Sequence, residues 1–393
     1  MDFCISDAQN RLAAEAQAFG ETVLNQNLEA RDARGSYDDA EWRAIWKDCA
    51  DFGLFGLTVP RDMGGAGHDV VTAAAIMHGL GYGCRDNGLM LAINAQLWTV
   101  VMPILEFGTP EQKARYLGPI LRGDWIGADA VTEAASGSDA MTVATVALKG
   151  DGGYVLNGEK TLVGQAPGCD FAIVFAATDP TAGPWGVSAF LVDASVPGFQ
   201  PGPEVQKSGL RTIATGALRF SDCAVPEWAR LGPEGAGSAI FARSGEWERQ
   251  MIFCGQVGRM KRQLYDCIAF ARSRKASGKP IEQNQSVANR LADMRLRYET
   301  AWLMQMRAAW QMDTGASDAM QAAITKLHIS EAFLASSLDA VRTFGGQGFM
   351  FDTDMARDLR DAMGGVIYGG TSDIQRNIIA QYQSRAHLTP PSP

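Results

Sequence analysis

The chain has 393 residues, of which 46% are hydrophobic and 20% are charged. This length exceeds one ordinary hydrophobic core, so two or three packed domains are expected. The net charge of −9 argues against nucleic acid as the main partner. The seven cysteines are scattered without a C-x-x-C pair, and the four histidines are dispersed, so we expect reduced, mostly buried thiols and no metal site. No apolar run reaches the roughly 18 residues of a membrane span, and the N-terminus lacks the order of a signal peptide, which predicts a cytoplasmic protein.

The first 125 residues have the apolar spacing of helices. The runs 40–57 and 110–123 place apolar side chains at helical intervals and are punctuated by glycine and proline. Thr109 followed by Pro110 is typical of a helix cap with a proline in the first turn. We therefore expect a helical domain over residues 1–125.

Residues 126–235 have the sequence pattern of β-strands instead of helices. The segment 142–163 alternates apolar and small polar residues, with GDGG (150–153) and NG (157–158) as turn signals. Further strand-like runs follow, and no long helical segment separates them. This pattern favours a central antiparallel β domain over an α/β sheet.

The helical pattern returns over residues 236–387. Long amphipathic runs, three of them clear, predict a four-helix bundle. We expect the last residues, 388–393, to be a frayed tail. Residues 256–300 carry 10 Lys and Arg against 4 Asp and Glu, a net charge of +6. This basic segment is either a solvated helix face or a surface that meets phosphates or an acidic partner.

Known nucleotide fingerprints are absent from the sequence. No G-x-G-x-x-G follows a strand, and the P-loop-like run 153–161 has Glu159 inserted before Lys160, so a hairpin turn explains it better. Three other segments are more specific. VTEAASGSD (131–139) can offer backbone N–H groups to an anionic ligand, TFGGQGF (343–349) permits close backbone approach, and YGGTSDIQR (368–376) opens a helix.

In order and spacing, these segments resemble the acyl-CoA dehydrogenase family over nearly the whole chain. The matching motifs are VTEAASGSD, NGEK, GLRTIATGALRFSDCAVP, WERQ, ARSRKASGKPIEQNQ, LADM, FGGQGF and YGGTSDIQR. Within the family, SAIFARSGEWERQ and ASSLDAVRTFGG are similar to dehydrogenases of carrier-protein-tethered L-prolyl groups. Because the usual prolyl pattern is replaced by GLRTIATG, we do not extend prolyl specificity to this chain.

The resemblance implies a mostly α fold with a central β domain, one FAD per subunit and a homo-oligomer, usually a tetramer. The resemblance implies that one group of residues contacts the flavin of its own subunit. A second group is expected to contact the FAD of a neighbouring subunit. The first group is Val131, Thr132, Gly137, Ser138 and Gly164, with Thr371 and Asp373 near the diphosphate. The second group is Arg274, Gln285, Arg342 and Gly346. Substrate contacts are expected from Ser138, Arg249, Tyr368 and Gly369.

Two departures from the family pattern concern the flavin. Leu162, Val163 and Gly164 replace a run that usually ends in a hydroxyl residue, so the Gly164 N–H would have to serve in its place. Ser277 stands where a phenylalanine is common, which loosens one packing contact at the cofactor.

The third departure concerns the catalytic base. Most of the family supplies a glutamate at the position of Gly369, and that side chain is missing here. A minority place the base on a helix of the last domain in an E-R pair, which matches Glu248 and Arg249. Glu248 is therefore the expected base, against the alternative that it is a first-turn glutamate stabilising a helix N-terminus.

The implied reaction is α,β-dehydrogenation of an acyl or aminoacyl thioester on CoA or a carrier protein. The α-proton goes to Glu248 and the β-hydride to flavin N5. Either an electron-transfer flavoprotein or O₂ would accept the electrons. The alternatives are a flavin-dependent oxygenase or N-hydroxylase on the same fold, and an inactive FAD-binding scaffold.

Overall fold

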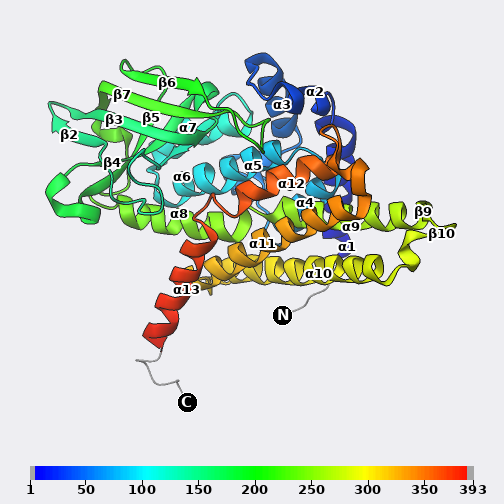
Figure 1. Cartoon of the computed structure of the whole chain (residues 1–393). Coiled ribbons are helices and arrows are strands. Elements are labelled where there is room, and N and C mark those ends of the chain that lie inside the picture. Colours follow the sequence, from blue (N-terminus) through cyan, green and yellow to red (C-terminus); the bar gives the residue numbers. More distant parts are fainter. Residues whose placement is uncertain (1–4, 387–393) are drawn as a thin grey trace.

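A computed structural model describes residues 5–386 (Figure 1). The predicted succession of helical, β and helical regions is confirmed. In the N-terminal region Thr109 caps the last helix as expected: its Oγ1 accepts the Gln112 N–H at 3.2 Å, and the Gln112 side chain accepts the Thr109 N–H at 2.9 Å. The helices of this region are α1 (Asp7–Phe19), α2 (Leu28–Arg34), α3 (Asp39–Asp51), α4 (Val70–Gly83), α5 (Asn87–Ala95), α6 (Met102–Phe107) and α7 (Pro110–Leu121).

One stretch of this region corrects the expectation that no apolar run is long enough to span a membrane. Helices α5 and α6 and the π-helical turn between them form a continuous apolar segment, Asn87–Phe107. By length and composition it could cross a bilayer, but 83% of its apolar window is buried inside the protein. The segment is therefore accounted for as a core helix.

The central β region is a single main sheet with the order β6-β7-β3-β2-β4-β5-β8. The sheet is mixed, because β1 and β2 both pair with β4 in parallel, whereas the remaining pairs are antiparallel as expected. The strands are β1 (Gly127–Ala130), β2 (Val146–Gly150), β3 (Gly153–Gly164), β4 (Phe171–Ala177), β5 (Val187–Asp193), β6 (Phe199–Glu204), β7 (Thr215–Pro226) and β8 (Arg230–Leu231).

The two turn signals of this region have different outcomes. GDGG forms the β2–β3 turn, with Gly150 opposite Gly153. The NG pair does not turn, and the hairpin expected there is wrong. Strand β3 runs through it with a register shift against β7 between Leu156 and Gly158. A Cβ built on Gly158, whose φ is +149°, would lie 2.7 Å from the Thr145 Cα, so a side chain has no room there.

The C-terminal helices form a bundle around α11, which packs against the other five (Figure 1). The first predicted run is not one helix, because it breaks at Ile252 and Phe253 into α8 and α9. The short β9–β10 hairpin (Lys275–Ala276 and Lys279–Pro280) protrudes at one end of the bundle, and α13 projects from the other (Figure 1). The helices are α8 (Gly237–Met251), α9 (Cys254–Ser273), α10 (Gln285–Asp313), α11 (Ala319–Phe344), α12 (Asp354–Gly365) and α13 (Ser372–Ala386).

The cysteines within residues 5–386 are free and buried, as predicted. Cys4 and the expected tail over residues 388–393 lie outside the described residues. Within residues 5–386, no cluster of His, Cys, Asp and Glu side chains could hold a metal ion.

Candidate active site

Glu248 lies in the last turn of α8, three residues before the helix ends at Met251. The alternative that it stabilises a helix N-terminus is therefore wrong. At a helix C-terminus the macrodipole disfavours a carboxylate, so the position costs stability and requires another explanation.

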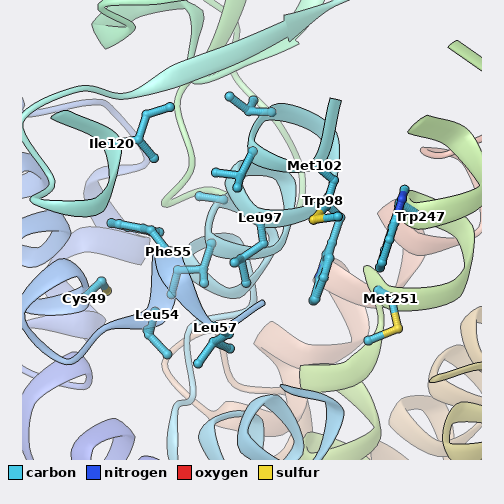
Figure 2. Close-up of a cluster of buried hydrophobic side chains, with 14 of the residues drawn as sticks. Cys49, Leu54, Phe55, Leu57, Leu97, Trp98, Met102, Ile120, Trp247 and Met251 are labelled. Atoms are coloured by element: carbon cyan, nitrogen blue, oxygen red, sulfur yellow. The ribbon is translucent and has the colours of Figure 1, made fainter. Parts of the chain in front are cut away.

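The neighbouring Trp247 fixes the orientation of this turn (Figure 2). Its ring stacks on Trp98 with centroids 5.7 Å apart and an interplanar angle of 3°. Its Nε1–H donates to Glu106 Oε1 at 2.8 Å, and Arg243 pairs with the same carboxylate. Because Trp247 is anchored to the N-terminal region, the adjacent Glu248 is held on another face of α8.

Gly369, in the loop before α13, provides the space that Glu248 occupies. A Cβ built on Gly369 would lie 3.2 Å from Glu248 Oε1 and 3.4 Å from its Cδ. The backbone there also has φ +64°, which favours glycine. The Glu248 carboxylate thus lies directly beside the position from which most of the family supplies its base.

Two cavities meet at Glu248. The first, of about 370 Å³, is lined by parts of α5, β3, α12 and the segment 207–215. The second, of about 440 Å³, is lined by the segment 131–141, part of β3, α8 and the start of α13. Asp129, Leu162 and Glu248 line both cavities. The combined space has the size of a small-molecule site between packed regions.

Burial raises the pKa of Glu248, and the nearby cations Arg249 and Lys326 oppose this shift. Burial, followed by the charge of Glu248, raises the pKa of Asp129 well above its ordinary value. Lys326 on α11 is fully buried with no hydrogen-bond acceptor for its Nζ, and burial lowers its pKa to about 8. A carboxylate with a raised pKa beside a cavity can act as a general base when a substrate presents an acidic proton to it.

A buried ion pair shapes the loop that borders the second cavity. Lys160 Nζ donates to Glu133 Oε1 at 2.8 Å and to the Val131 carbonyl at 3.1 Å. The same carboxylate accepts the N–H groups of Ala144 and Thr145 at 2.7 and 3.0 Å. Burial alone would raise the pKa of Glu133, but these donors, led by Lys160, lower it. The loop 133–139 is thus closed onto β3 by a fully partnered carboxylate.

The structure brings most of the predicted site residues to the two cavities. Gly164 and Tyr368 line the first, where the Tyr368 ring stacks on Phe253 with centroids 5.4 Å apart. The predicted residues lining the second are Val131, Thr132, Gly137, Ser138, Arg249 and Gly369.

Thr371 and Asp373, which were predicted to lie near the diphosphate, interact within the first turns of α13. Thr371 Oγ1 accepts the Ile374 N–H at 3.2 Å and so caps α13, and the exposed Asp373 pairs with Arg376 at 3.1 Å. Neither lines a cavity, whereas Gly370, Ile374 and Gln375 beside them line the second one.

The residues expected to reach a neighbouring subunit are remote from the cavities. They are exposed and cluster where α9 ends, α10 begins and α11 ends, near the β9–β10 hairpin. Arg342 forms a local ion pair with Asp339 at 3.4 Å. These residues are Arg274, Gln285, Arg342 and Gly346.

The departures from the family pattern have distinct positions. Leu162 is 63% exposed, has φ +54° and faces both cavities, so a large apolar surface borders the junction. Ser277, at φ +50°, is in the exposed turn of the β9–β10 hairpin and lines neither cavity.

Sequence reasoning missed Asp129 and Lys326. Asp129 stands two residues before VTEAASGSD, in a strand that is otherwise small and apolar, and this isolated charge was the available signal. Lys326 lies in a helical run where a lysine is normally solvated, so only the packing of α11 reveals its burial.

Comparison with known proteins agrees with this architecture along the chain. The family models for the acyl-CoA dehydrogenase N-terminal, middle and C-terminal domains match residues 6–124, 128–223 and 235–383. An "L-prolyl-[peptidyl-carrier protein] dehydrogenase" of Pseudomonas fluorescens is 41% identical over 382 residues, covering 97% of this chain and 99% of that protein.

Two solved structures share the fold over almost their whole length. The "Prolyl Acyl Carrier Protein Oxidase AnaB" superposes with a TM-score of 0.94 at 38% identity, covering 97% of this chain and 100% of that one. The structure described as "PigA with FAD and proline" superposes with a TM-score of 0.93 at 36% identity, covering 98% and 99%.

Proposed function

Because the chain belongs to the acyl-CoA dehydrogenase family, we propose that it is an FAD-dependent dehydrogenase of an aminoacyl thioester on a carrier protein, with Glu248 as base. The observation that carries the proposal is the position of the Glu248 carboxylate, at the meeting point of two cavities and beside the side-chain-free Gly369. The relatives named for prolyl carrier proteins support the aminoacyl substrate over a free acyl-CoA.

The second cavity fits FAD. It has glycine and hydroxyl residues along the loop 131–141, and a Cβ on Gly137 would meet nothing within 4 Å, so the backbone is open to a ligand. On the opposite side Gln375 Oε1 is buried without a hydrogen-bond partner. Val131, Thr132, Gly137 and Ser138 would hold the flavin, with Thr371 and Asp373 nearer the diphosphate. When bound, FAD supplies the acceptor for the two electrons that leave with the β-hydrogen.

Glu248 performs the proton transfer. Its carboxylate takes the α-proton, which the neighbouring thioester carbonyl acidifies, and its raised pKa makes it a stronger base than an exposed glutamate. The Gly369 N–H has no acceptor among residues 5–386, so it can donate to the thioester oxygen as negative charge develops there. Stacking of Trp247 on Trp98 packs α8 against the N-terminal region and holds this turn in place.

Partners and assembly follow from the same proposal. The names of the relatives include both a dehydrogenase and an oxidase, so an electron-transfer flavoprotein and O₂ are both acceptors to test. The exposed Arg274, Gln285 and Arg342 would complete the cofactor site of a neighbouring subunit in a tetramer. Reduced, buried cysteines support a cytoplasmic location.

The test is anaerobic mixing of the holoenzyme with carrier-tethered aminoacyl, carrier-tethered acyl and CoA thioesters, monitored by flavin absorbance. We expect bleaching with an aminoacyl thioester, and an E248Q rate lower by about 10²–10⁴-fold. Glu246, which pairs with Arg243 at 3.1 Å on the same helix, provides the matched control, and E246Q should bleach at the wild-type rate.

Two outcomes would contradict the proposal. A full rate of bleaching in E248Q would exclude this residue as the base and would assign the proton transfer to another group. No bleaching of the wild type by any thioester would favour an inactive scaffold.

A further inference from the structure

The junction of the two cavities contains a second carboxylate, Asp129, which the base and the cofactor do not explain. Asp129 is the third residue of β1 and is held opposite Ile173 by parallel pairing with β4. It lines both cavities, as Glu248 does. Among residues 5–386 its carboxylate accepts no hydrogen bond and forms no ion pair.

Three of the positive groups around the junction are bonded elsewhere. Lys160 on β3 is bound to Glu133 and to the Val131 carbonyl. In the first cavity, Lys207 donates to the Ile213 carbonyl at 2.7 Å, and Arg360 donates to Asp32 at 2.6 Å. Arg249 lines only the second cavity and is the sequence neighbour of Glu248. The junction thus joins two carboxylates without a protein cation bonded to either.

Such an arrangement is unfavourable for an empty or apolar site. Burial and the charge of Glu248 both raise the pKa of Asp129, and the charge of Lys160 only partly opposes them. An acyl chain at this point would leave the carboxylate desolvated and unpaired. A cationic ligand group between the two carboxylates would remove both penalties.

We infer that Asp129 is a specificity-determining residue that binds the protonated α-amine of an aminoacyl thioester. The inference rests on the proposed function, because the amine is bonded to the same α-carbon whose proton passes to Glu248. A group attached to that carbon must lie beside the Glu248 carboxylate, and Asp129 is the acid that shares both cavities with it. The first cavity thereby selects aminoacyl over simple acyl groups of the same shape.

The test compares two pantetheine thioethers of equal shape that cannot be oxidised, one carrying an L-prolyl-like ring with its amine and one carrying a cyclopentyl ring. Binding to holoenzyme is measured by calorimetry for wild type, D129N and the control E246Q. We expect wild type and E246Q to prefer the amine ligand. In D129N the preference should fall by about 30-fold or more, with cyclopentyl affinity unchanged or higher. An N-formyl ligand, which is neutral, should bind wild type as weakly as the cyclopentyl ligand.

Two results would overturn the inference while leaving the proposed function intact. One is an unchanged amine preference in D129N, and the other is equal binding of the amine and N-formyl ligands by wild type, which needs no variant. If the corresponding prolyl and cyclopentanecarbonyl thioesters both fail to bleach the wild-type flavin and neither thioether binds, the proposed function itself fails, and this inference fails with it.

Discussion

Two groups of buried acids in this molecule differ in how they are partnered. Between α9 and α12, Asp358 accepts from Arg259 Nε at 3.0 and 2.9 Å, from Gln263 at 2.8 Å and from Asn87 at 2.9 Å. At the cavity junction, the side chains of Asp129 and Glu248 accept no hydrogen bond from residues 5–386. The acid of the first group is bonded within the fold, whereas the acids of the second group line the two cavities.

The difference separates structural acids from functional ones. A buried carboxylate without a partner costs free energy, whereas a bonded one fixes the elements that it joins. Asp358 connects α12 to α9 and to the start of α5, so its chemistry is complete within the chain. Asp129 and Glu248 line the two cavities, so we expect a bound ligand to supply their hydrogen-bond partners.

The largest expected effect on stability comes from breaking the partnered group. In R259M, Asp358 loses its guanidinium partner inside the core, so the free energy of unfolding should fall by about 3–5 kcal/mol. Urea unfolding followed by tryptophan fluorescence measures this change. The matched comparison is E248Q, which removes a carboxylate that no protein group bonds and should leave stability unchanged or higher. If R259M and E248Q lost the same free energy of unfolding, the distinction between structural and functional acids would be wrong.

A smaller effect is expected from the positive charge near the base. Lys326 opposes the raised pKa of Glu248, so K326M should raise that pKa further. The base acts only when deprotonated. The acidic limb of the kcat/KM profile should therefore move to higher pH in K326M, while K326R, which keeps the cation, should preserve it. An unmoved limb in K326M would show that Lys326 does not act through Glu248.

The fold was largely predictable from the sequence, because helix caps and apolar periodicity are local. Thr109 and Pro110 mark the start of α7 correctly, whereas the NG pair at 157–158 marks a bulge inside β3, since pairing with β7 overrides local turn chemistry. The break at Ile252 and Phe253 carries no glycine or proline and was invisible for that reason.

The candidate site was predictable where it depends on motifs. The replacement of the usual glutamate by Gly369 indicated Glu248, and the structure places the two residues side by side. Asp129 and Lys326 escaped prediction because their importance depends on burial without partners, which arises only when β1, α8 and α11 pack together.

The most direct test of the central claim follows exchange of the α-proton alone. Holoenzyme reduced beforehand with dithionite cannot accept a hydride, so incubation with an L-prolyl carrier thioester in D₂O isolates the proton-transfer step. Mass spectrometry of the recovered prolyl group reports deuterium at the α-carbon. If Glu248 is the base, wild type and E246Q incorporate deuterium, and E248Q incorporates it only at the rate without enzyme. Incorporation by E248Q at the wild-type rate would contradict the assignment.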